Sequence, residues 1–161
     1  MTEPPGDPPA TLRDEVVELR LLRVLGPAHA AARPPELRFL AAAPEYRYAI
    51  HRLADGVRVG RIHLRVTADP AIVEILGHAG YAVDPEHRGR GYASRALTML
   101  RRIARQAGVA PLRVFIAPDN VASRRTAERA GLELVDEVEA APEALALGLE
   151  RRLCRYRARE P

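Results

Sequence analysis

The chain has 161 residues, 47% of them hydrophobic and 29% charged, which suits one folded domain and argues against intrinsic disorder. Its formal net charge is +4 and every basic side chain other than histidine is arginine, so a lysine nucleophile, a lysine base and a Walker-type phosphate loop are excluded. No apolar run could cross a bilayer and the N-terminus lacks a signal-peptide pattern, so we expect a cytoplasmic protein with no membrane partner.

The N-terminal third of the sequence predicts a tail, a strand and short helices. Residues 1–10 are rich in proline and predict a disordered tail, which a single domain over residues 11–161 follows. The run from 14 to 24 has β character and predicts the first strand. Residues 25–45 are rich in alanine and interrupted by prolines, and they predict short helices such as one over 36–43.

A hairpin signal comes next. Two β-rich runs, 46–53 and 57–66, flank a tight turn at Asp55 and Gly56. In the second run arginine and histidine alternate with aliphatic residues, so one face of that strand is polar and the other apolar. The following run, 71–84, predicts a central strand that carries Glu74 and His78.

The remainder alternates between helix and strand patterns. Apolar residues at helical spacing from Tyr92 predict a helix that ends near Gly108. A strand is predicted over 112–117, and Asn120 is expected to cap a short helix that ends before Gly131. Two more strands, at 132–138 and 149–157, are joined by an alanine-rich loop. The order predicts a mixed α/β sheet in one domain.

The turn between the central strand and the long helix has an unusual composition, DPEHRGRGYASRA, from Asp84 to Ala96. The first backbone N–H groups of a helix have no internal partner, and the helix dipole adds positive charge there. Glycines let that backbone approach a phosphate closely, and arginines add charge at the rim. The turn therefore predicts a pyrophosphate cradle; a tight turn with incidental arginines is the alternative.

Known phosphate motifs can be compared with this turn. The dinucleotide fingerprint would need a glycine or alanine at Ser94 and an acidic residue about twenty positions further on, and neither is well met. A different phosphate-binding motif fits every position from Arg88 to Ala93. It consists of Gln or Arg, any two residues, Gly, any one residue, and then Gly or Ala.

At these residues the chain resembles the GNAT superfamily of acetyl-CoA-dependent N-acetyltransferases. The segment DNVASRRTAERAGL is similar to a second motif of the family, with Asn120, Ser123 and Gly131 in register. The upstream run GRIHLRV and the run GHAGYAVDPEHRGRGYA are similar to the bacterial ribosomal-protein N-terminal acetyltransferase branch. The resemblance covers roughly residues 46–138 and implies a mixed, mostly antiparallel sheet with a central splayed strand pair and flanking helices.

The resemblance also implies acetyl-CoA as co-substrate and a set of residues that bind it. The central strand would hydrogen-bond the pantetheine arm and the acetyl carbonyl, the glycine turn would hold the pyrophosphate, and Asn120 would contact the pantetheine. The residues implied are Tyr81, Ala82, Val83, Arg88, Gly89, Arg90, Gly91, Tyr92, Ala93, Ser94, Asn120 and Ser123.

The usual acid and base of the family are missing here. The position of its tyrosine acid is Ala127, and the position of a common glutamate base is Phe115. The resemblance offers Ser123 as the acid, and His78 and Glu74 as candidate bases. A hydroxyl bonded within the helix and a buried structural histidine are the alternatives. No metal is expected, because the five histidines form no ligand pattern.

We therefore predict direct transfer of acetyl from acetyl-CoA to a primary amine, either a small molecule or a protein N-terminus. Residues 25–45 and 139–148 would build the acceptor pocket, and a homodimer through 149–157 is expected. Two alternatives stay open. One is a catalytically silent coenzyme-A-binding module. The other is an arginine-rich nucleic-acid-binding domain, although an aromatic content of 4% gives no sign of stacking platforms.

Overall fold

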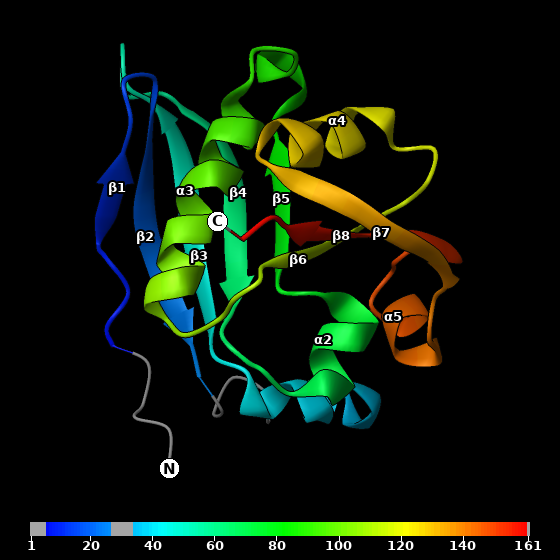
Figure 1. Cartoon of the computed structure of the whole chain (residues 1–161). Helices are drawn as coiled ribbons and strands as arrows, with labels where there is room; N and C mark the ends of the chain where they lie inside the picture. The colour runs from blue at the N-terminus through cyan, green and yellow to red at the C-terminus, as the bar shows by residue number, and fades with distance from the viewer. Residues whose placement is uncertain (1–5, 27–33, 161) are drawn as a thin grey trace.

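The computed structural model describes residues 6–26 and 34–160, and within them eight strands form one sheet in the order β1-β2-β3-β4-β5-β6-β8-β7 (Figure 1). Every neighbouring pair is antiparallel except β5 and β6, which are parallel. The predicted mixed, mostly antiparallel sheet is confirmed. The strands are β1 (Thr11–Arg13), β2 (Val17–Leu25), β3 (Glu45–Arg52), β4 (Arg58–Arg65), β5 (Ala79–Val83), β6 (Arg113–Ile116), β7 (Leu132–Glu139) and β8 (Arg152–Ala158).

The helices lie at three places around the sheet. Figure 1 shows α3 across one face of the strands β2 to β5, with α4 at one end of the molecule and α2 and α5 at the other. None of the helices in the described part of the chain is long and apolar enough to span a membrane. The helical elements are η1 (Pro35–Ala42), α2 (Pro70–Leu76), η2 (Pro85–His87), α3 (Tyr92–Gln106), α4 (Val121–Arg129) and α5 (Pro142–Ala146).

The main core lies between α3 and the apolar face of the sheet. The alternation predicted for β4 is present, because Ile62 and Leu64 are buried under the helix while Arg61 is exposed on the other face. On α3, residues at helical spacing such as Leu97 and Leu100 fill the same core. Burial of this kind, at roughly 25 cal/mol per Å² of apolar surface, is what fixes α3 and its preceding turn on the sheet.

Part of the predicted disordered tail is attached to the sheet. Residues 1–5 lie outside the described residues. The carbonyl oxygen of Pro9 accepts a 3.1 Å hydrogen bond from the Tyr48 hydroxyl, and that of Ala10 accepts a 2.8 Å bond from the backbone N–H of Leu21. These bonds hold the segment just before β1 against β2 and β3.

The predicted strand over 71–84 is wrong in its first half, which is the helix α2. Asp69 caps this helix by accepting a 2.9 Å hydrogen bond from Ala71 N, and Pro70 occupies its first turn, where no backbone donor is needed. Ile72, Val73 and Leu76 fall on one face and are buried. The strand β5 begins only at Ala79, so Glu74 lies on a helix and His78 just before the strand.

The segment predicted as a loop between the last two strands contains α5. Its Ala144 packs with Leu40, Ala43, Ile72 and Leu76 in a second, smaller core made by η1, α2 and α5. Residues 149–157, through which a homodimer is expected, offer no free strand edge. β8 is paired on both sides, by β6 and by β7, so β7 is the edge strand and the homodimer stays a prediction without that edge.

Candidate functional site

The parallel strands β5 and β6 separate almost as soon as they meet. Their ladder contains one pair, Ala79 with Val114, and beyond it the strands splay. His78, just before this pair, holds the two strands together at the end where they meet. Its backbone N–H donates to Arg113 O at 2.8 Å, and Arg113 N donates to His78 Nδ1 at 3.0 Å. The predicted splayed pair is therefore present.

A pocket of about 560 Å³ extends from the splayed end of β5 to the first turns of α3 and α4. All twelve residues that the resemblance implied for acetyl-CoA line this pocket. They are Tyr81, Ala82, Val83, Arg88, Gly89, Arg90, Gly91, Tyr92, Ala93, Ser94, Asn120 and Ser123.

The glycine turn forms the floor of the pocket at the N-terminus of α3. Gly91 caps the helix with φ of 78°, a left-handed conformation that side chains rarely adopt. The nearest heavy atom to a Cβ built there would be Ser94 Oγ at 3.9 Å, so the space in front of the turn is open. Unpaired backbone N–H groups and the helix dipole therefore face an open cavity, an arrangement that suits an anion.

Two residues of β5 direct their backbone N–H and C=O groups into the gap between β5 and β6. Just outside the two ends of β5, His78 O accepts from Arg65 N at 2.6 Å and Asp84 N donates to Val59 O at 2.9 Å, so the even-numbered residues within β5, Gly80 and Ala82, face β4. Because strand residues alternate, Tyr81 and Val83 turn their N–H and C=O groups toward β6, beyond the last paired residue. One of these groups is already hydrogen-bonded, because Arg88 Nε donates to Val83 O at 2.9 Å.

The first turn of α4 forms the wall across the gap. Asn120 caps the helix as predicted, with Oδ1 accepting a 3.1 Å hydrogen bond from Ser123 N. The hydroxyl of Tyr81 donates to Ser123 O at 2.9 Å, and burial raises the pKa of Tyr81, so this donor stays protonated. The Ser123 hydroxyl itself makes no hydrogen bond to any other described residue and faces the pocket.

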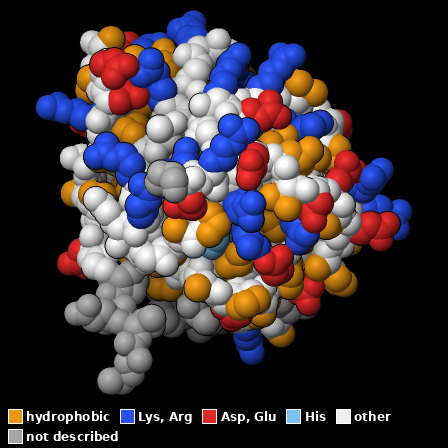
Figure 2. All heavy atoms as spheres, viewed as in Figure 1, with side chains coloured by type: hydrophobic (Ala, Val, Ile, Leu, Met, Phe, Trp, Pro, Cys, Tyr) orange, Lys and Arg blue, Asp and Glu red, His pale blue; other side chains and the backbone are white. Residues whose placement is uncertain are grey.

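The pocket is also lined by five residues that the resemblance did not imply: His87, Ala122, Arg125, Thr126 and Arg129. Four of them recur at intervals of three and four along α4, which is the spacing of one helix face. No carboxylate lines the pocket among the described residues. Figure 2 shows arginine side chains gathered over the upper part of the face where Figure 1 places α4.

His78, a predicted base, lies at the closed end of the strand pair and does not line the pocket. It is 4% exposed, and burial lowers its pKa from 6.5 to about 4, so the ring is neutral near pH 7. Nδ1 is occupied as the acceptor for Arg113 N. This geometry fits the structural role that the sequence left open.

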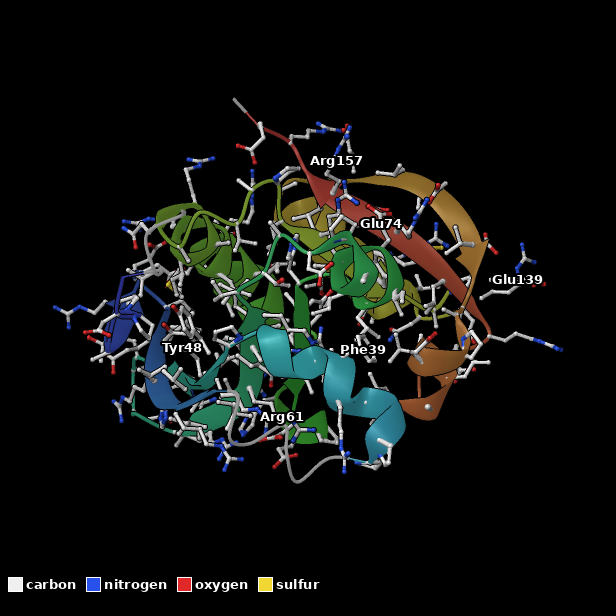
Figure 3. The ribbon with its side chains drawn as sticks, turned by 90° about the horizontal axis from the view of Figure 1, so that it is seen from below. Phe39, Tyr48, Arg61, Glu74, Glu139 and Arg157 are labelled. Atoms are coloured by element: carbon white, nitrogen blue, oxygen red, sulfur yellow. The ribbon has the colours of Figure 1, made fainter. Side chains whose placement is uncertain are left out.

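Glu74, the other predicted base, also lies away from the pocket. Figure 3 shows it on α2, on the side of β8. Its carboxylate forms ion pairs with Arg113 and, at 3.0 Å, with Arg155 Nη1. The pairs are partly exposed, so they tie α2 to the sheet only weakly, by up to about 1 kcal/mol each. The prediction erred because it placed Glu74 on the central strand.

The two positions where the family commonly has an acid and a base remain apolar in the folded chain. Ala127 is fully buried on the inner face of α4, and Phe115 lies on β6. No group of three or more metal-ligating side chains occurs in residues 6–26 and 34–160. The titratable or hydroxyl groups that face the cavity are therefore those already named on β5, the turn and α4.

Comparison with known proteins relates this arrangement to one family. A model described as the acetyltransferase (GNAT) domain matches residues 20–133. The chain is similar to the L-2,4-diaminobutyric acid acetyltransferase of Streptomyces coelicolor, with 39% identity over 95 residues. That match covers 56% of this chain and 55% of the relative, so the chain matches about half the length of that enzyme.

Two solved structures share the fold. RimJ of Mycobacterium smegmatis in complex with CoA-disulfide aligns with a TM-score of 0.59 and 18% identity, over 88% of this chain and 80% of that one. The ribosomal-protein-S5-alanine acetyltransferase of Vibrio fischeri aligns with a TM-score of 0.59 and 13% identity, over 91% and 94% of the two chains. At these identities the likeness establishes the fold alone.

Proposed function

Because the chain belongs to the GNAT acetyltransferase family, whose domain model matches residues 20–133, we propose that it transfers the acetyl group of acetyl-CoA directly to a primary amine. The observation that carries the proposal is the convergence of all twelve residues implied for acetyl-CoA on one pocket. These residues come from three separate segments of the sequence, β5, the glycine turn and the start of α4, and only the fold brings them together.

The chemistry of the pocket fits a coenzyme with a pyrophosphate and an amide-containing arm. The open turn at Gly91 offers backbone donors to an anion, and the pocket has arginines but no carboxylate among its described lining residues. The backbone N–H and C=O of Tyr81 and the N–H of Val83 face the gap between β5 and β6, where they can bond to the amides of an extended arm, whereas Val83 O is bound by Arg88.

Acetyl-CoA supplies the acetyl group as a thioester. We assign to a β5 backbone N–H, at Tyr81 or Val83, the hydrogen bond to the carbonyl oxygen on which negative charge develops. As the C–N bond forms and the C–S bond breaks, we assign to the Ser123 hydroxyl the protonation of the departing thiolate, because Ser123 lines the pocket and its hydroxyl has no other partner among the described residues. The serine regains its proton, through water, from the nitrogen, which loses one proton after the attack. Asn120 holds this turn of α4 in place through its cap.

Removal of the amine proton does not require a side chain of this pocket. We assign His78 and Glu74 to the scaffold, because each is engaged by Arg113 away from the cavity. The acceptor amine then reaches its neutral form by losing a proton to water. Alignment of thioester and amine supplies the acceleration, since effective concentrations of aligned groups can be very large.

For the acceptor, we propose an amino acid or a related small amine as the first class to test, because the curated relative is named for L-2,4-diaminobutyric acid. A protein N-terminus is the second class, on the likeness to the ribosomal-protein acetyltransferases. Residues 25–45 and 139–148 remain the segments we assign to the acceptor side. Residues 27–33 lie outside the described part of the chain, and η1 and α5 pack together.

The experiment that tests the proposal measures thiol release from acetyl-CoA in the presence of a panel of amines, with the acetylated product identified by mass. A silent coenzyme-A-binding module would bind the coenzyme but release no thiol with any amine. An arginine-rich nucleic-acid-binding domain would show steeply salt-dependent binding to nucleic acid and no preference for the coenzyme.

A further inference from the structure

The helix α4 presents two arginines to the pocket from the wall opposite the glycine turn. Ala122, Arg125, Thr126 and Arg129 recur at helical spacing and all line the cavity. The helix packs on the core through the buried Ala127, and Ala130, just after the helix, is buried in the same core. The orientation of Arg125 and Arg129 is thus set by the packing of α4, not by chance exposure.

These two guanidinium groups are not paired with a carboxylate of residues 6–26 or 34–160. Neither forms an ion pair or a side-chain hydrogen bond with any residue in the described part of the chain. Their neighbour Arg124, by contrast, donates to the Tyr156 hydroxyl at 3.0 Å and to Pro118 O at 3.1 Å. Like charges four residues apart on a helix repel each other and destabilise it. A pair of this kind that faces a cavity without carboxylates suits an anionic ligand.

The glycine turn already accounts for one anionic group of the coenzyme, the pyrophosphate. The arginine pair lies on a different element, and its side chains can bind a second anion bidentately. Coenzyme A carries such a second group, the phosphomonoester at the 3′ position of its ribose. Resting on the proposed function, we infer that Arg125 and Arg129 bind this 3′-phosphate and so make the protein select CoA over 3′-dephospho-CoA.

The test compares the affinities of the full-length protein for CoA and for 3′-dephospho-CoA by calorimetry at one ionic strength. The unaltered protein should bind CoA at least tenfold more tightly. In the double variant Arg125→Gln with Arg129→Gln, the affinity for CoA should fall until the two ligands bind within about twofold of each other. The affinity for 3′-dephospho-CoA should stay within about twofold of that of the unaltered protein.

A matched control separates a specific contact from the general charge of the molecule. Arg102 is an exposed arginine of α3 that does not line the pocket and forms no ion pair with another described residue. Arg102→Gln removes one positive charge and should leave the preference for CoA unchanged. A thermal melt of each variant checks folding, because Arg129 also lies in the last turn of α4, where a cation stabilises the helix dipole.

The possible results lead to different conclusions. If the unaltered protein binds CoA and 3′-dephospho-CoA equally well, the inference is wrong and the proposed function is untouched. If the double variant weakens both ligands by the same factor, the arginines contact the pyrophosphate and the inference is again wrong. If neither ligand binds, the proposed function fails as well, and the inference fails with it.

Discussion

His78 and Arg113 are joined by two hydrogen bonds, one from His78 N to Arg113 O at 2.8 Å and one from Arg113 N to His78 Nδ1 at 3.0 Å. Together they close the end of the β5–β6 gap from which the strands diverge. The ring therefore serves as a fixed acceptor in a buried place, and its removal should damage the fold more than the chemistry.

We predict that His78→Leu lowers the free energy of unfolding by about 1–3 kcal/mol, because the Arg113 N–H is left buried without an acceptor. His78→Asn should recover much of this loss, since its amide oxygen can accept the same bond. Chemical denaturation of the three proteins measures the effect. A stable His78→Asn variant that has lost its turnover would instead support a catalytic role.

The stability of the protein should depend on pH through two of its histidines, the partly buried His63 and the buried His78. Burial lowers the pKa of His63 and of His78 from 6.5 to about 4. Between these values the unfolded chain binds more protons than the folded one, so the free energy of unfolding falls as the pH drops from about 6.5 to 4. The contribution of the neutral histidines to that free energy is at its full size above pH 6.5. From pH 7.5 to 5 the loss should be roughly 1–2 kcal/mol for each histidine.

His63→Gln isolates one of these contributions. The ring of His63 lies against the backbone of Gly80, where a Cβ would come within 2.5 Å of its Cε1. Urea denaturation at pH 7.5 and pH 5 should show a smaller difference in this variant than in the unaltered protein. Equal differences in the two proteins would mean that His63 takes up its proton at an ordinary pH in the folded state.

Gly91→Asp should weaken coenzyme A binding at least tenfold, which is about 1.4 kcal/mol. The substitution puts a negative charge in front of the helix N-terminus, where the structure leaves open space. Gly108→Asp is the matched control, because Gly108 also has a positive φ, of 73°, and open surroundings, but lies after α3 and outside the pocket. Calorimetry on both variants decides; equal affinities would remove the cradle.

Ser123→Ala should lower turnover by about 100-fold while the affinity for acetyl-CoA changes little, since general acid assistance is typically of that size. Thr98→Ala, which removes an exposed hydroxyl on α3, is the control and should have normal turnover. A folded Ser123→Ala protein with near-normal turnover would show that the thiolate leaves without help from this hydroxyl.

The sequence predicted the glycine turn and its flanking strand and helix well, because the signals for them are local. A strand, a glycine turn and a helix start are encoded within Asp84 to Ala96, and the cap at Asn120 is equally short-range. The glycine turn and the Asn120 cap are both present in the structure, because tertiary packing does not oppose these local conformations. The splayed pair came from the family resemblance, since neither strand alone indicates where its ladder stops.

The features that the sequence analysis did not predict correctly share one cause, which is that they depend on tertiary packing. An apolar run as short as Ile72 to Leu76 fits a buried strand or a buried helix equally, and the capping signal at Asp69 and Pro70 was the clue that distinguished them. No motif singled out Arg125 and Arg129, because arginine is frequent throughout the chain. Only the packing of Ala127 and Ala130 into the core shows that Arg125 and Arg129 face the pocket.

The most direct test of the account is the rate of thiol release from acetyl-CoA by the unaltered full-length protein, with and without each amine of a panel that includes 2,4-diaminobutyric acid, other amino acids and short peptides with a free N-terminus. The account predicts release that depends on at least one amine, a product heavier by one acetyl group, and loss of both in Gly91→Asp at subsaturating acetyl-CoA. Tight binding of the coenzyme without amine-dependent release across the panel would contradict it.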